Sequence, residues 1–245
     1  RVLRRALLWT AFAVVHIGVA WIAWSQPNQP MGDVYNVYEP WSAQALSGGG
    51  IVGVTEPWVY PQLALVPMLA AWIFAPFGYT VGWAVLVIVC DAIGFAFLVG
   101  RARARGREVA AWFWLAANAA LGPVAIYRLD AITVPLALLG CLWLVGRPWL
   151  AGTLLTVATW IKVWPAALVA AAVIVVRRRL AIIGASAVVS AVVLGTVLAL
   201  GGAAVALGFV SDQTGRGLQL EAPISTVYVW QALLGVPGAS VYYNQ

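Results

Sequence analysis

A carboxylate stands in the first polar stretch of the sequence, where residues 31–41 read Met-Gly-Asp-Val-Tyr-Asn-Val-Tyr-Glu-Pro-Trp. The side chain of Asp33 could accept the proton of an attacking hydroxyl group, which is the work of a general base. The same residue also suits the N-cap of a helix, because an Asp side chain can accept hydrogen bonds from the free N–H groups of the first turn. The sequence leaves both interpretations of Asp33 open.

A second polar stretch follows a long apolar segment, and residues 211–223 read Ser-Asp-Gln-Thr-Gly-Arg-Gly-Leu-Gln-Leu-Glu-Ala-Pro. Glycines on both sides of Arg216 let the backbone bend closely around a ligand. The guanidinium can grip a phosphate group through two parallel hydrogen bonds, and Gln219 and Glu221 could hold sugar hydroxyls. The alternative is an interfacial turn in which Arg216 extends its charged end toward water.

Two further cations border apolar segments. Arg128 stands two residues before Asp130, which favours a structural ion pair, although Arg128 is also a candidate phosphate ligand. Lys162 lies in the run Trp-Ile-Lys-Val-Trp-Pro between two apolar segments. Charges within membrane segments are costly and therefore indicate functional sites. The alternative for Lys162 is a side chain that extends to the lipid headgroups.

The composition determines the class of protein. The sequence is 63% hydrophobic and 9% charged, which excludes a water-soluble fold. Apolar runs recur along the chain at a length of about 20 residues, enough for a helix to cross a hydrocarbon core of about 30 Å. The runs are continuously apolar, whereas barrel strands would alternate. We therefore predict an all-α fold, a polytopic transmembrane helical bundle with juxtamembrane helices.

The arginines set the predicted topology. They form clusters at 1–5, 101–107, 147 and 177–179, and under the positive-inside rule all of these lie in the cytoplasm. This requires that residues 60–76 lie along or dip into the outer leaflet instead of crossing. The predicted crossings are 6–24, 80–100, 109–122, 129–145, 149–161, 165–176 and 180–207. The segments 149–161 and 165–176 are short, so we expect a shallow hairpin with Lys162 at its tip.

This threading gathers three basic residues and six of the eight acidic residues on the non-cytoplasmic face of the plasma membrane, where we expect any chemistry to occur. Those charges are Asp33, Glu39, Glu56, Arg128, Asp130, Lys162, Asp212, Arg216 and Glu221. We expect one transmembrane domain over residues 1–245, with an external loop at 25–78 and an external segment at 208–245. The absence of an initiator methionine and the end at Gln245 indicate the N-terminal part of a longer protein.

Several other partners are disfavoured. The formal net charge of +6 comes from the topology clusters, so nucleic acid is not expected as a partner. His16 is the only histidine, so we expect no metal site, and the sequence lacks nucleotide-binding fingerprints that would indicate a cofactor. Asp91 lies near the middle of its helix, where a lone carboxylate costs roughly 2.5 to 3.5 kcal/mol. We expect Asp91 to have a polar partner or a proton, and His16 to bond between helices.

The polar motifs follow one another in an order that resembles a known family. Gly32-Asp33, Tyr60-Pro61, the Lys-x-x-Pro of residues 162–165, and the Arg-Gly-Leu-Gln-Leu-Glu of residues 216–221 resemble the membrane glycosyltransferases of the GT-C superfamily that use polyprenyl-phosphate sugars. Glycosyltransferase family 87, which includes actinobacterial α-1,2-mannosyltransferases, is the most similar. The last motif is the most specific. In one departure, Gln62 stands where the family tends to have a second proline.

The resemblance implies inverting transfer of mannose from polyprenyl-phospho-mannose to a lipid-anchored mannoside, a glycolipid acceptor, at the outer face of the lipid bilayer. It implies that Asp33 is the base, and it leaves metal dependence open. It also implies that cations hold the departing phosphate, and that other side chains contact the sugar or the acceptor. The implied phosphate ligands are Lys162, Arg216 and Arg128, and the implied sugar or acceptor contacts are Tyr35, Tyr60, Gln219 and Glu221.

Two alternatives come from other classes of protein. A transporter or flippase for lipid-linked sugars would place ionisable residues near the membrane midplane, often at broken helices between repeats. Only Asp91 fits that pattern, and no repeat is visible. A non-catalytic scaffold for envelope-synthesis enzymes would use the external loops to bind partners.

Overall fold

The computed structural model describes residues 2–27, 29–100, 105–211 and 224–240. These ranges form helices and the turns between them, and the β pairing within them is one isolated bridge between Val52 and Glu56. The chain divides into two compact units, Arg1–Phe209 and Val210–Gln245. The prediction of an all-α fold is confirmed.

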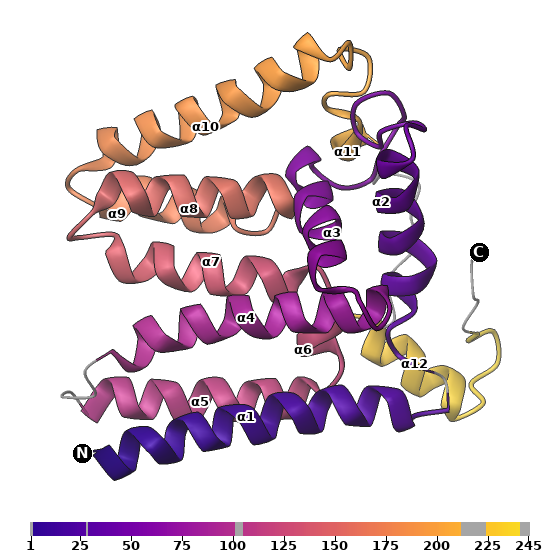
Figure 1. The fold of residues 1–245 in the computed structure, drawn as a ribbon, viewed down its shortest axis with the longest axis vertical. Helices are drawn as coiled ribbons and strands as arrows, with labels where there is room; N and C mark the ends of the chain where they lie inside the picture. Colours follow the sequence, from indigo (N-terminus) through magenta and orange to yellow (C-terminus); the bar gives the residue numbers. More distant parts are fainter. Residues whose placement is uncertain (1, 28, 101–104, 212–223, 241–245) are drawn as a thin grey trace. The chain divides into compact units, whose positions relative to one another are not determined.

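Seven helices of the first unit run back and forth side by side (Figure 1). They are α1 (Val2–Ser25), α4 (Tyr79–Val99), α5 (Arg105–Leu121), α7 (Asp130–Trp143), α8 (Pro148–Ile161), α9 (Ala166–Val175) and α10 (Arg179–Ala199). The main packing order is α1, α5, α4, α7, α8 and α10, with α9 against α8 and α10. This packing places α7 beside α8, so the ends of these two helices, which carry Asp130 and Lys162, are adjacent.

The outside of this bundle is apolar. Among the described helices, α1, α4 and α10 are long and apolar enough to cross a membrane, and four shorter segments are also apolar. Large side chains such as Leu3, Ile17 and Trp21 are 82%, 68% and 73% exposed. At roughly 25 cal/mol per Å² of apolar surface, contact with water would be unfavourable over the whole bundle, whereas lipid tails are a suitable solvent. The exposed faces agree with the predicted membrane bundle.

Short helices lie across one end of the bundle, as Figure 1 shows for α2 (Glu39–Leu46) and α3 (Leu65–Ala71). The π-helical turn η1 (Val34–Tyr38) leads into α2, and the 3₁₀ turns η2 (Gln62–Ala64) and η3 (Trp72–Phe74) flank α3. The hydroxyl of Tyr79 donates to the carbonyl of Met68 at 2.9 Å, and Trp72 Nε1 donates to Ser42 Oγ at 2.9 Å. Residues 60–76 therefore stay at the end where α1 finishes and α4 begins.

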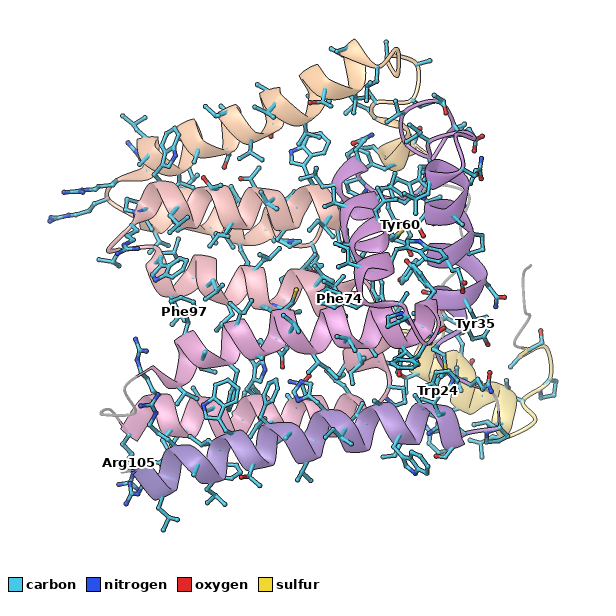
Figure 2. All side chains as sticks on the ribbon, in the orientation of Figure 1. Trp24, Tyr35, Tyr60, Phe74, Phe97 and Arg105 are labelled. Atoms are coloured by element: carbon cyan, nitrogen blue, oxygen red, sulfur yellow. The ribbon has the colours of Figure 1, made fainter. Side chains whose placement is uncertain are left out.

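The alternating helix directions separate the described charges into two ends. The basic end is the end of the bundle that carries Arg4, Arg5, Arg105, Arg107, Glu108, Arg147 and Arg177–Arg179. The mixed-charge end is the opposite one, which carries Asp33, Glu39, Glu56, Arg128, Asp130 and Lys162. In Figure 2, Arg105 lies at the side opposite to Trp24, Tyr35 and Tyr60. This separation follows the charge pattern that the threading predicts.

A buried polar cluster joins three helices in the middle of the bundle. His16 Nε2 lies 2.8 Å from Asp91 Oδ2, and Trp114 Nε1 donates to both carboxylate oxygens of Asp91 at 3.0 Å. His16 Nδ1 lies 2.9 Å from the carbonyl oxygen of Phe12. The two expectations are confirmed: His16 bonds between α1 and α4, and Asp91 has polar partners from α1 and α5.

Close packing fixes the position of α8. A Cβ atom on Gly152 would lie 3.0 Å from both Cα and O of Ile182, so a larger residue here would push α8 and α10 apart by a few tenths of an ångström. Side chains also join the two helices, since Thr156 Oγ1 donates to Ser186 Oγ at 2.7 Å. Helix α8 also packs extensively on α7. Lys162 lies in the turn directly after α8, so the packing of α8 on α7 and α10 fixes where this turn begins.

The second unit is described over residues 210–211 and 224–240, and α11 (Gly208–Ser211) spans the boundary between the units. Its main helix is α12 (Ser225–Leu233), on which Val227, Tyr228, Trp230 and Leu233 are exposed. A small cavity lies beside this helix and is lined by Tyr228, Gln231 and residues 236–240.

Candidate functional site

The candidate base lies just before the turn η1, and its side chain does not cap a helix. The structure gives no hydrogen bond from the Asp33 side chain to the backbone of η1. Instead, Asp33 Oδ2 accepts from Nη1 of Arg128 and forms an ion pair with it. The N-cap interpretation of Asp33 is therefore wrong, because a residue 95 positions away in the chain holds the carboxylate.

Arg128 lies between α6 (Val124–Tyr127) and α7, in extended backbone with φ −115° and ψ 152°. The next residue is anchored, since the backbone N–H of Leu129 donates to the hydroxyl of Tyr38 at 3.2 Å. Tyr38 is buried, and its ring centroid lies 4.7 Å from that of Trp83. Trp83 Nε1 in turn donates to the carbonyl of Ile126 at 3.0 Å. Two adjacent contacts, from Asp33 and Tyr38, thus fasten η1 to the turn before α7.

Tyr38 is a structural residue and not a second base. Burial raises the pKa of its hydroxyl well above the usual value, and the neighbouring Tyr60 and Asp33 raise it further. The hydroxyl therefore stays protonated at neutral pH. Sequence reasoning missed Tyr38, and no local signal sets it apart from Tyr35 in the same stretch.

The ammonium group of Lys162 forms an ion pair with Asp130. Lys162 has extended backbone, with φ −150° and ψ 137°, between α8 and α9. Two residues on, Trp164 Nε1 donates to Thr133 Oγ1 at 3.1 Å, and that hydroxyl donates to the carbonyl of Asp130 at 3.0 Å. The predicted hairpin with Lys162 in its turn is present, and two contacts hold this turn on the first turn of α7.

The two ion pairs are neighbours, because Arg128 and Asp130 flank Leu129. The side chains are partly accessible: Arg128 is 26% exposed, Asp33 32%, Lys162 34% and Asp130 40%. Ion pairs in contact with solvent contribute only about 0 to 1 kcal/mol, so another anion or cation can replace one partner at low cost. Two carboxylates and two cations thus form a row that a charged ligand can reach, which we call the charged row.

The other predicted site residues fall in different places. Tyr35 is partly exposed, with its hydroxyl 3.4 Å from the carbonyl of Gln29, and both Tyr35 and Tyr60 lie at the mixed-charge end (Figure 2). Tyr60 forms edge-on ring contacts with Trp41 and Trp58, at centroid distances of 6.2 and 5.7 Å. The candidates in the second polar stretch lie outside the described residues. These are Arg216, Gln219 and Glu221.

The residue that departs from the family pattern has a structural contact. Gln62 is buried, and its Nε2 donates to the carbonyl of Ala206 at 2.8 Å. This bond ties η2 to the segment after α10, a contact that a proline in the same position could not form. Gln62 therefore supports the local fold around Tyr60.

Within the described ranges, no three His, Cys, Asp or Glu side chains are grouped so that they could hold a metal ion. The charged row pairs each carboxylate with a cation instead.

Comparison with known families is decisive for the class of protein. The family model of glycosyltransferase family 87 matches residues 58–239. The chain belongs to glycosyltransferase family 87. It is therefore a glycosyltransferase, and its substrates are a sugar donor and an acceptor. Searches of curated proteins and of solved structures gave no match.

The match confirms the family that the motif order indicated. The matched region includes Arg128, Asp130, Lys162 and residues 216–221, and it begins after Asp33. The base assignment for Asp33 therefore depends on the contacts of its side chain. Family membership also favours an enzyme over a transporter, and Asp91, the one carboxylate that fitted a transport path, is enclosed by His16 and Trp114.

Proposed function

We propose that this family 87 glycosyltransferase moves mannose from polyprenyl-phospho-mannose to a lipid-anchored mannoside with inversion at the sugar carbon. The observation that carries the proposal is the charged row, in which a candidate base, Asp33, is paired with Arg128, and Asp130, two residues further along the chain, is paired with Lys162. The reaction needs both a proton acceptor and a positive site for a leaving phosphate, and this row offers both.

The chemistry requires one displacement. The acceptor hydroxyl attacks the anomeric carbon and gives its proton to Asp33, while the bond from that carbon to the phosphate oxygen breaks. The electron pair of this bond passes to the phosphate. A phosphate monoester has its second pKa at about 6, so polyprenyl phosphate leaves without an acid to protonate it. One carboxylate therefore suffices, and attack from the opposite side inverts the configuration.

Fixed cations would stabilise the charge that grows on the leaving group, which is the largest contribution in many enzymes. Arg128 and Lys162 occupy neighbouring turns and can face one phosphate together. We assign Arg216 to the same phosphate, and Tyr35, Tyr60, Gln219 and Glu221 to the sugar or the acceptor.

A cavity beside the Lys162 turn suits the lipid part of the donor. It has a volume of about 360 Å³ and lies between α8, α9 and α10. Its lining is mostly apolar, with Trp160 and Val163 on either side of Lys162 and Phe209 near Trp160. Because Val163 lines this cavity, an isoprenoid chain in it would lie next to the turn that carries Lys162.

We place the reaction on the outer side of the plasma membrane. The basic end carries the described arginines of the clusters and would face the cytoplasm under the positive-inside rule. The mixed-charge end would then lie outside, together with the donor phosphate and the acceptor sugar.

The direct test uses the full-length protein and polyprenyl-phospho-mannose with radiolabelled mannose. We expect Asp33→Asn to lower transfer by about 10² to 10⁴-fold, because general base catalysis contributes that much. The matched control is Glu56→Gln, since Glu56 lies at the same end and bonds Gln44 at 3.0 Å instead of a cation. Undiminished transfer in Asp33→Asn would defeat the base assignment, and preference for another lipid-linked sugar, such as polyprenyl-phospho-arabinose, would defeat the choice of mannose.

A further inference from the structure

Two of the three cations that the proposed function assigns to the donor phosphate, Arg128 and Lys162, are already bound to carboxylates. Arg128 Nη1 donates to Asp33 Oδ2, and Lys162 Nζ donates to Asp130 Oδ2. While Arg128 donates to this carboxylate, a proton that arrives on Asp33 lies beside the positive charge of the guanidinium, and this repulsion opposes its transfer from an acceptor hydroxyl. In the protein without a donor, the negative charges of Asp33 and Asp130 therefore balance the positive charges of Arg128 and Lys162.

We propose that the donor phosphate and these two carboxylates compete for the same cations, so that Asp33 is released as a base when the phosphate takes Arg128. This inference rests on the proposed function and adds a regulatory role for Asp130, which would keep Lys162 neutralised until a donor arrives. Arg128 is then a positioning residue for the base as well as a ligand of the leaving group.

Charge balance gives the exchange its direction. The donor is a phosphodiester with one negative charge, the same charge as the carboxylate that it replaces. When the bond to the sugar breaks, the phosphate becomes a monoester and gains a second negative charge. At equal distance, the attraction of a guanidinium for it then doubles. Arg128 is thus drawn from Asp33 toward the phosphate during the step in which the base must accept a proton.

The accessibility of the row makes the exchange feasible. All four side chains are between 26% and 40% exposed, so neither pair is sealed from a ligand. The backbone that carries them is fixed, by Tyr38 on Leu129 and by Trp164 on Thr133. The side chains can therefore change partners while the turns remain in place.

The test measures binding and not turnover, with the full-length protein in lipid nanodiscs. The probe is farnesyl phosphate, a short polyprenyl monophosphate, and farnesol is the neutral control. We expect Asp33→Asn and Asp130→Asn each to tighten the binding of farnesyl phosphate about threefold to tenfold, because each removes a competitor of modest strength. Binding of farnesol should not change. Glu56→Gln removes the same charge at the same end and should leave both affinities unchanged.

A double-mutant cycle separates competition from general repulsion. If Asp33 competes for Arg128, the gain from Asp33→Asn disappears in an Arg128→Gln background. If the gain persists there, or if Glu56→Gln gives the same gain, the carboxylates only repel the ligand and the inference is overturned. The pair of Asp130→Asn and Lys162→Gln gives an independent cycle if Arg128→Gln does not fold.

The two levels of failure are distinguishable. If the wild-type protein binds farnesyl phosphate no better than farnesol, the proposed polyprenyl-phosphate donor is wrong, and the inference falls with it. If it binds the phosphate but neither carboxylate variant tightens binding, the proposed function stands and the exchange is wrong.

Discussion

The carboxylate of Asp91 and the carboxylates of Asp33 and Asp130 all have nitrogen partners, but their surroundings differ. Asp91 and His16 are almost fully buried, at 5% and 2% exposure, and three helices enclose them. Asp33 and Asp130 have partners of similar chemistry, but their side chains are about a third exposed. The buried cluster can only hold α1, α4 and α5 together, whereas the charged row can exchange partners. Exposure, and not the type of residue, is what distinguishes the two groups.

The largest expected effect comes from removing one carboxylate of each group. Asp33→Asn should lower mannose transfer by about 10² to 10⁴-fold and leave the unfolding midpoint nearly unchanged. Asp91→Asn should lower the unfolding midpoint and leave mannose transfer per folded molecule unchanged. Both are measured by radiolabel transfer and by thermal unfolding in detergent. Equal losses of transfer in the two variants would abolish the distinction between the groups.

The buried cluster should respond strongly to the loss of one partner. His16→Leu leaves the Asp91 carboxylate with Trp114 alone, and breaking a buried pair costs about 3 to 5 kcal/mol of unfolding free energy. The double variant His16→Leu, Asp91→Leu should recover most of this loss, because no charge is then left unpaired. Denaturant unfolding measures both. A double variant less stable than the single one would contradict this explanation.

The charged row should affect substrate binding in a selective manner. Lys162→Ala should weaken binding of the polyprenyl-phosphate donor about 10-fold to 100-fold, because a hydrogen bond to a charged group is worth about 1.5 to 3 kcal/mol. Acceptor binding should change little. The control Arg5→Gln removes an exposed cation at the basic end and should change neither affinity. Equal weakening of donor and acceptor would make Lys162 a structural residue.

The smallest effect should come from the packing that supports the row. Gly152→Ala places a Cβ atom 3.1 Å from Ala185 Cβ and 3.0 Å from the backbone of Ile182, so α8 must shift. We expect a loss of about 1 to 3 kcal/mol in unfolding free energy. Gly195→Ala is the matched control, because nothing lies within 4 Å of the added atom. Stability unchanged in Gly152→Ala would show that the α8–α10 contact can relax.

Most of the fold was predictable because its determinants are local. Apolar runs mark the helices, so the all-α fold follows without tertiary information, and the assignment of which runs cross the membrane stays a prediction. Helix ends are less well determined. The apolar pattern predicts a helix from residue 109, whereas α5 begins at Arg105. Its first turn therefore contains polar residues of the basic loop, which an apolar pattern does not detect.

The partners of the site residues could not be predicted, because they depend on contacts distant in sequence. Arg128 and Asp130 stand together in the chain, which favoured a pair between them, yet Arg128 pairs with Asp33 and Asp130 with Lys162. The two true pairs are 95 and 32 residues apart. The cap and base interpretations of Asp33 are equal in sequence; the structure shows no cap hydrogen bond from its side chain, and the base assignment stays a proposal.

Leu129 has a consequence for how this region tolerates change. It is fully buried, its N–H is bound by Tyr38, and it separates the two members of the charged row that come from the same turn. One added or deleted residue at this point would rotate Arg128 or Asp130 away from its partner while the other stayed in place. For the two ion pairs, the spacing of one residue between Arg128 and Asp130 therefore matters more than which apolar residue stands at position 129.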